Sequence, residues 1–181
     1  MKRNIIAKAI FSIALGAIIG FTATTALAGV GHGPKTNIGT PGKASAATRT
    51  IEVKMHDNYF EPENISVKEG ETVRFIVKND GEFVHEFNIA TGEMHKAHGP
   101  EMMMMMEQGV IQADKIDWDA AKKMQASMGH GVHNDPNSVL LEPGKSGEIV
   151  WTFPENTKLE FACNVPGHYD SGMVGKINLS H

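Results

Sequence analysis

The chain has 181 residues, of which 41% are hydrophobic, enough for one domain of ordinary size with a single core and some additional segments. Its 21 acidic and 17 basic side chains give a formal net charge of −4 at pH 7. An acidic chain binds the phosphates of nucleic acids poorly, so nucleic acid is not an expected partner.

Residues 1–28 have the pattern of a secretory signal peptide. A basic start over residues 1–8 precedes an apolar run from Ala9 to Phe21, and Ala26-Leu27-Ala28 forms a small-x-small cleavage site. The apolar run is short for a membrane anchor, so membrane attachment is expected only if this segment stays uncleaved. We therefore expect an exported, periplasmic protein, whose formal charge falls from −4 to −7 when three basic side chains leave with the signal.

The next segment, residues 29–49, is rich in Gly, Pro, Thr, Ala and Ser and has no apolar periodicity, which predicts a flexible linker. Beyond it the chain contains one cysteine, Cys163. Oxidising compartments normally pair cysteines, so a single exported thiol needs protection, and a bound metal would supply it.

From residue 50 onwards, apolar and polar residues alternate with the period of two that is typical of β-strands with one wet face. Turn sequences separate the strands at Glu69-Gly70, at Asn79-Asp80-Gly81 and at residues 142–147. The expected strands contain Ile51–Met55, Ile65–Val67, Val73–Val77, Phe83–Ile89, Val139–Leu141, Ile149–Phe153, Leu159–Cys163 and Met173–Leu179. About eight strands at this spacing predict an all-β domain over residues 50–181, a Greek-key β-sandwich.

An insertion of about residues 91–137 interrupts this pattern and is rich in methionine and histidine. Within it, Ile116–Met128 is expected to form a short helix, with Asp117 as N-cap and Gly129 as the C-terminal stop. The soft and imidazole side chains of the insertion predict a second copper site that prefers Cu(I). Its candidate ligands are Met94, His95, His98, His130 and His133, beside the run Met102–Met106.

One loop places three metal-binding side chains at short spacing. Cys163 lies in phase with the apolar residues of its strand, Pro166-Gly167 turns the chain, His168 follows, and Met173 starts the next strand. A fourth ligand is expected from another strand, and His85 fits because it alternates in phase with Phe83, Phe87 and Ile89, which places all four on the apolar, buried face. A thiolate, imidazoles and a weak thioether together favour copper.

These residues resemble the cupredoxin family of azurins, plastocyanins, auracyanins and rusticyanins, and Cys-Asn-Val-Pro-Gly-His is similar to the azurin form of the loop. The resemblance covers roughly Thr50 to His181 apart from the insertion. It implies a type 1 copper held by His85, Cys163, His168 and Met173. Glu86 stands where azurins and plastocyanins usually have an Asn that ties the two ligand segments together, which affects the hydrogen bonds around the site, its colour and its potential.

Two other kinds of site use some of the same residues. Zinc could be held by one Cys and two His with water in the fourth position, but a Met in that position suits copper better. A Cys/His hydrolase needs an oriented base and an oxyanion hole, and no nucleophile signature surrounds Cys163.

The first hypothesis is an exported type 1 copper protein that transfers electrons by an outer-sphere route, in copper tolerance or handling. Its redox protein partner would dock near His168, and no catalytic residue or organic substrate is expected. The alternatives are a copper-sequestering or copper-delivery protein, and a cuprous oxidase that uses Cu(I) bound in the insertion.

Overall fold

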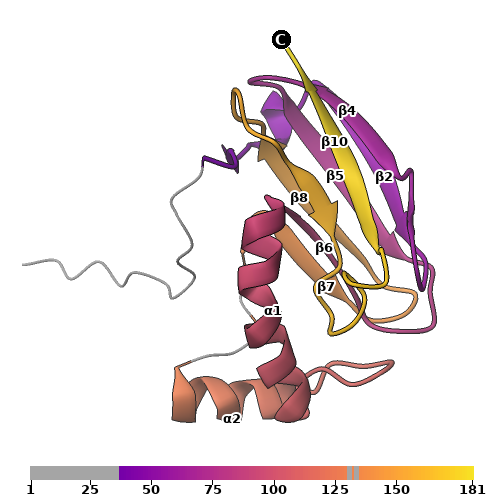
Figure 1. Cartoon of the computed structure of the whole chain (residues 1–181), viewed down its shortest axis with the longest axis vertical. Helices are drawn as coiled ribbons and strands as arrows, with labels where there is room; N and C mark the ends of the chain where they lie inside the picture. The colour runs from indigo at the N-terminus through magenta and orange to yellow at the C-terminus, as the bar shows by residue number, and fades with distance from the viewer. Residues whose placement is uncertain (1–36, 130–131, 133–134) are drawn as a thin grey trace, which may run out of the picture. The chain divides into compact units, whose positions relative to one another are not determined.

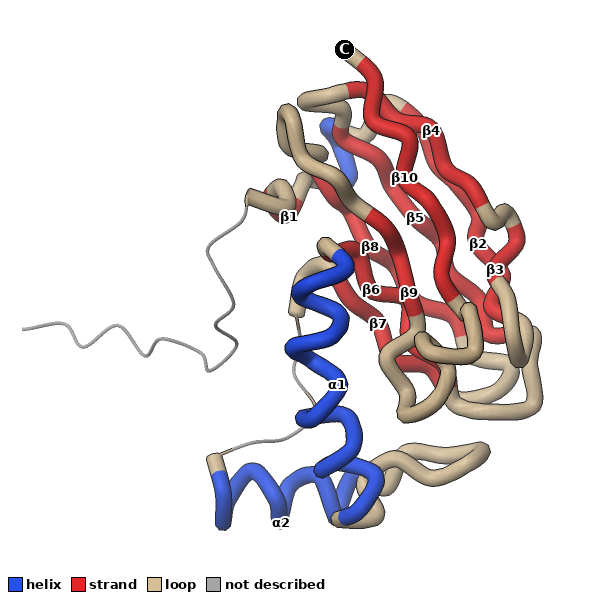
Figure 2. The backbone as a smooth tube through the Cα atoms, in the orientation of Figure 1, coloured by secondary structure: helices blue, strands red, loops and turns tan. Residues whose placement is uncertain are grey.

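The computed structural model describes residues 37–129, 132 and 135–181. The expected signal peptide and the first residues of the expected linker lie outside this part of the chain. The described residues form two five-stranded sheets and two α-helices (Figures 1 and 2). Neither helix in the described part is long and apolar enough to cross a membrane.

The strands of each sheet come from distant parts of the chain. The first sheet has the order β1 (Thr40–Pro41), β8 (Ser146–Thr152), β5 (Thr72–Asn79), β2 (Arg49–Met55) and β3 (Phe60–Glu61). The second has the order β4 (Asn64–Lys68), β10 (Val174–Ser180), β9 (Glu160–Ala162), β6 (His85–Ala90) and β7 (Ser138–Leu141). Neighbours are antiparallel except for the parallel pairs β2 with β5 and β4 with β10. The predicted all-β sandwich is confirmed, and every expected strand is present.

The core contains inward-facing residues that the alternation predicted together with residues that it did not, such as Phe60 of β3, and aromatic rings lie at its centre. The Phe60 and Phe161 rings lie 5.1 Å apart between centroids, and Phe87 contacts both at 5.9 and 5.3 Å. Gly175 in β10 faces this cluster, and a Cβ at that position would lie 2.0 Å from Cζ of Phe161. Glycine is therefore required there for the ring to pack against the backbone of β10.

Residues 37–49, the second part of the expected linker, pack on the first sheet. β1 pairs with β8, and a short 3-10 helix, η1 (Ala44–Ala46), follows. The Trp151 indole donates a hydrogen bond to the Ile38 carbonyl at 2.9 Å. The sequence did not predict this packing, because the segment has no apolar periodicity. Hydrogen bonds to the edge of the sheet hold it in place.

Strand β6, which carries His85, is buried on both faces. The alternation placed Phe83 on the buried face, and this was wrong: Phe83 is 45% exposed because the strand begins only at His85. Glu86 and Asn88 point away from the core of the sandwich and are nonetheless buried. The cover on that side comes from the insertion.

The insertion forms two helices, α1 (Gly92–Glu107) and α2 (Trp118–Met128). The caps of α2 are confirmed: the Asp117 side chain accepts hydrogen bonds from the N–H groups of Asp119 and Ala120, and Gly129 has a left-handed φ of 72°. Helix α1 was not predicted. It runs beside β6 and β7 (Figure 1), and a pocket of about 180 Å³ lined by α1, the start of α2 and β7 lies between them.

Candidate metal centre

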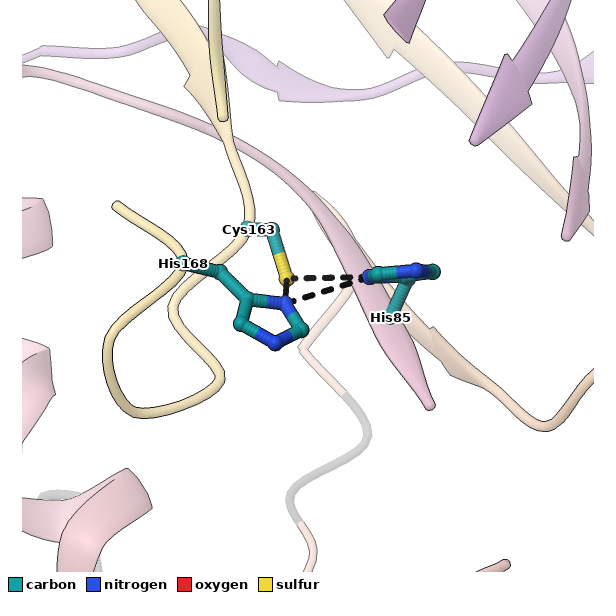
Figure 3. Close-up of side chains that lie close together, drawn as sticks. All are labelled: His85, Cys163 and His168. Atoms are coloured by element: carbon teal, nitrogen blue, oxygen red, sulfur yellow. Dashed lines mark hydrogen bonds between the residues drawn. The ribbon is translucent and has the colours of Figure 1, made fainter. Parts of the chain in front are cut away.

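Three side chains that the sequence singled out meet at one end of the second sheet. His85 starts β6, Cys163 directly follows the antiparallel neighbour β9, and His168 lies in the loop before β10. Their donor atoms lie within 4.8 Å of one another, and the described residues contain one such group (Figure 3). The Cys163 Sγ is 3.3 Å from Nδ1 of His168 and 3.8 Å from Nδ1 of His85, and the two Nδ1 atoms are 3.2 Å apart.

His85 is oriented by a residue that the sequence analysis did not single out. Its Nε2 lies 3.1 Å from the carboxylate of Asp57, which also accepts hydrogen bonds from the N–H groups of Glu82 and Phe83. A carboxylate on the outer nitrogen turns the other nitrogen, Nδ1, toward the site. Burial lowers the pKa of His85 although Asp57 opposes the shift, so the imidazole is neutral and able to bind a metal at neutral pH.

Cys163 is completely buried, as its phase in the strand predicted. Burial and the charge of Glu86 raise the pKa of its thiol to about 12, against hydrogen bonds from the N–H groups of Glu86 and Val165. The Glu86 N–H donates to Sγ at 3.3 Å. The thiol therefore keeps its proton at neutral pH until a cation replaces it.

The loop between Cys163 and Met173 is closed by backbone hydrogen bonds. The Met173 N–H donates to the His168 carbonyl at 2.9 Å, and the Cys163 N–H donates to the Met173 carbonyl at 3.1 Å. Gly167 adopts a φ of 88°, which permits the sharp turn before His168. The Met173 side chain is fully buried. Three of the four predicted type 1 ligands, Cys163, His168 and Met173, therefore lie in one hydrogen-bonded segment, and the fourth, His85, lies at the start of β6.

The chemistry of the donors suits a soft metal. One thiol and two imidazoles converge, and burial also lowers the pKa of His168, to which the nearby His85 contributes, so both rings are neutral. A buried thioether, Met173, follows in the same loop. The residues present therefore fit copper, which takes thiolate and imidazole ligands with a weak thioether.

The histidines expected in the second copper site have separate partners in the described part of the chain. His95 is buried and its Nδ1 lies 3.1 Å from Oδ1 of Asn164. His98 lies between two carboxylates, with Nε2 3.6 Å from Glu86 and Nδ1 3.2 Å from Glu101. Met94 lies in the first turn of α1 and is half-buried. His130 and His133 lie outside the described residues.

Comparison with known proteins identifies the family of the chain. A family model described as a cupredoxin-like domain matches residues 14–116. The copper-resistant cuproprotein CopI of Pseudomonas aeruginosa is 45% identical over 177 residues, which cover 92% of this chain and 93% of the relative. The protein of the same name from Rubrivivax gelatinosus is 37% identical over 190 residues, covering 98% of each chain.

Solved structures show the same fold. Auracyanin B superposes with a TM-score of 0.53 at 18% identity, covering 81% of this chain and 100% of that chain. An azurin, Az-iso2 from Methylomonas sp. strain J, gives a TM-score of 0.50 at 16% identity, covering 75% of this chain and 100% of that chain. The chain therefore belongs to the cupredoxin-like family, and its similarity over almost the whole length is to copper-resistant cuproproteins.

Proposed function

We propose that this chain is an exported type 1 copper protein that transfers electrons by an outer-sphere route as part of copper tolerance. The observation that carries the proposal is the convergence of Nδ1 of His85, Nδ1 of His168 and Sγ of Cys163 beside the buried Met173. Bound copper would supply a one-electron Cu(I)/Cu(II) couple at these ligands. The relatives named copper-resistant cuproproteins support the role in tolerance.

The protein's own contribution is a fixed ligand arrangement. His85 is held by Asp57, and Cys163 and His168 are held by the hydrogen-bonded loop, so their positions need not change when the metal changes its charge. His168 is half-buried while His85 and Cys163 are fully buried, so we assign the partner-facing side of the site to His168. Export is inferred from the signal pattern and the single cysteine.

The test is copper loading of the purified mature protein. Wild type should bind Cu(II) at the site and become intensely blue or green through thiolate-to-copper charge transfer, and the colour should disappear and return on reduction and reoxidation. Cys163→Ser should abolish the colour with an unchanged far-ultraviolet circular dichroism spectrum, because Ser nearly conserves the volume. A colourless loaded wild type, or colour that survives in the variant, would refute the assignment.

A second candidate function is Cu(I) binding by the insertion, for storage, delivery or oxidation through the type 1 site. The observation that favours it is the pocket beside α1, which His98, Met102 and Met105 line with one imidazole and two thioethers. Thioethers select Cu(I) over Cu(II). Met94, His95, His130 and His133 remain further candidates for this second site.

Anaerobic Cu(I) titration tests this second candidate. We expect more than one Cu(I) per protein, and one fewer in the volume-conserving double variant Met102→Leu/Met105→Leu. The matched control is Met103→Leu/Met106→Leu, which changes two exposed methionines of the same helix and should keep the wild-type count. A wild-type count of one would leave α1 as a structural or partner-binding element.

A further inference from the structure

A buried carboxylate links the two segments that carry the proposed ligands. Glu86 follows His85 in β6 and is 3% exposed. Its Oε2 accepts hydrogen bonds from the N–H and the side-chain amide of Asn164, at 3.3 and 2.7 Å, and Asn164 follows Cys163. Its own N–H donates to Cys163 Sγ at 3.3 Å. Glu86 thus connects the start of β6 to the cysteine segment through both its main-chain N–H and its side chain.

Helix α1 reaches both members of this link. The His98 Nε2 lies 3.6 Å from Oε1 of Glu86, and the His95 Nδ1 lies 3.1 Å from Oδ1 of Asn164. The residue that follows each of the two ligands, His85 and Cys163, therefore contacts a histidine of the insertion. Two further side chains donate to Glu86 Oε1, Ser138 at the start of β7 at 2.6 Å and the amide of Asn88 at 3.2 Å.

The contacts of Glu86 suit an anion. Its carboxylate oxygens accept hydrogen bonds from the Ser138 hydroxyl and from the N–H and side-chain amide of Asn164, and the His98 ring lies 3.6 Å away, so its partners are hydrogen-bond donors. A negative charge this close to the site is poorly screened in the protein interior.

We propose that Glu86 is a positioning residue of the metal centre, and that His98 and His95 extend this role to helix α1, so that the insertion sets the redox properties of the site. This inference rests on the proposed copper site. Because a negative charge stabilises Cu(II) more than Cu(I), Glu86 lowers the reduction potential. Because its N–H donates to Sγ of Cys163 and its side chain holds the next residue, Asn164, it also sets the orientation of the thiolate and the energy of its charge-transfer band.

The first experiment compares Glu86→Gln with wild type after loading with one equivalent of Cu(II). We expect a higher reduction potential by spectroelectrochemistry and a displaced charge-transfer maximum, with copper still bound. The matched control is Glu107→Gln, which removes one exposed carboxylate from the end of α1 and should change neither property. Melting of the metal-free proteins separates these effects from loss of the fold.

The second experiment asks whether α1 acts through Glu86. His98→Ala should also shift the charge-transfer maximum, and the double variant Glu86→Gln/His98→Ala should match Glu86→Gln alone, because the carboxylate through which His98 acts on the site is then absent. Non-additivity of this kind identifies residues that share one interaction. Additive shifts would mean that His98 acts independently, and the link through Glu86 would be wrong.

The outcomes separate this inference from the proposed function. A wild type that binds no coloured copper refutes the function itself. A coloured wild type whose potential and spectrum are retained in Glu86→Gln refutes the positioning role and leaves the function standing. If Glu86→Gln does not fold, Asn164→Ala takes its place, since it removes the side-chain amide bonded to Glu86, and an unchanged spectrum in that variant overturns the proposal.

Discussion

Asp57 is the residue at the metal centre that the sequence pattern did not reveal. It lies between β2 and β3, outside every alternating segment, and its carboxylate reaches His85 only through the fold. Cys163, His168 and Met173 could be predicted because short spacing within one loop already places them together. His85 could be predicted from its phase in a strand. A long-range hydrogen-bond partner has no comparable signal in a single sequence.

Glu86 was singled out by the sequence, but its partners could not be predicted. The sequence identified it as a departure from the usual Asn, yet gave no partner for its charge. Its buried position depends on α1, which lies beyond the end of its own strand in the chain and covers the outer face of β6. Asn164, which joins Glu86 to His95, likewise gains its role only when the ligand loop, β6 and α1 are together.

The protonated thiol of Cys163 leads to a prediction about proton release on copper binding. Because its thiol has a pKa of about 12 in the metal-free protein, while the pKa values of His85 and His168 are lowered, Cu(II) binding at pH 7.5 should release about one proton per copper. Apparent affinity should accordingly increase with pH between 7 and 9. Calorimetry in two buffers of different ionisation enthalpy measures the release.

The control for this measurement is Cys163→Ser, which should release no such proton on any residual copper binding. Release of no protons by wild type would show that the thiol is already ionised in the metal-free protein, against the burial of Sγ. Release of two or more would show that an imidazole is protonated there.

Of the two helices of the insertion, α1 is the one that the sequence did not predict. Gly92, Gly99 and Pro100 are poor residues for a helix interior, and five consecutive methionines do not display a face. The signal that could have identified it is Thr91, whose side chain accepts a hydrogen bond from the Met94 N–H as an N-cap. Eight of the strands, by contrast, were predictable, because alternation of apolar and polar residues makes their period visible.

The methionines of the run Met102–Met106 differ in burial according to the face of α1 on which they lie. Met102 and Met105 are three residues apart and buried, at 2% exposure each, while Met103 and Met106 are 44% and 38% exposed. Residues three apart lie on the same face of a helix. Part of the run therefore serves as core for the insertion, and part remains on the surface.

This division predicts unequal effects of two neighbouring substitutions. Met105→Ala should lower the free energy of unfolding by roughly 2–5 kcal/mol, because it leaves a cavity in the core. Met106→Ala should change it by no more than about 0.5 kcal/mol, as is usual for an exposed side chain. Urea unfolding of the metal-free variants measures both, and equal effects would contradict the helical placement of the run.

At the scale of the whole molecule, an ionic cluster ties strands at the end of β5 that is distant from His85. Glu71 accepts hydrogen bonds from Arg49 at 2.8 Å, from the Lys68 N–H at 2.9 Å and from Thr48 at 2.9 Å. Arg49 also donates to the Ser66 carbonyl in β4, so the cluster connects β2 of the first sheet with β4 of the second. It therefore helps to hold the two sheets together.

Through this cluster, the stability of the folded state should depend on pH. The hydrogen bond from Arg49 is the largest cause that lowers the pKa of Glu71, which falls from 4.5 to about 2 against the effect of burial. A carboxyl whose pKa is lower in the folded state stabilises the fold fully above its unfolded pKa, and this contribution is lost as the pH falls from about 4.5 to about 2. With solvent screening, the contribution is about 1–2 kcal/mol at pH 7.

Glu71→Gln should therefore destabilise the metal-free protein by about 1–2 kcal/mol at pH 7, and the difference from wild type should shrink as the pH is lowered toward 3. Urea unfolding at pH 7, 5 and 3 measures this trend. Glu148→Gln is the matched control, because the Arg74–Glu148 pair has side chains more than 40% exposed and should contribute less than about 1 kcal/mol. A Glu71→Gln difference that stays constant from pH 7 to pH 3 would mean that the cluster acts through packing, since loss of charge on Glu71 would then have no effect on the fold.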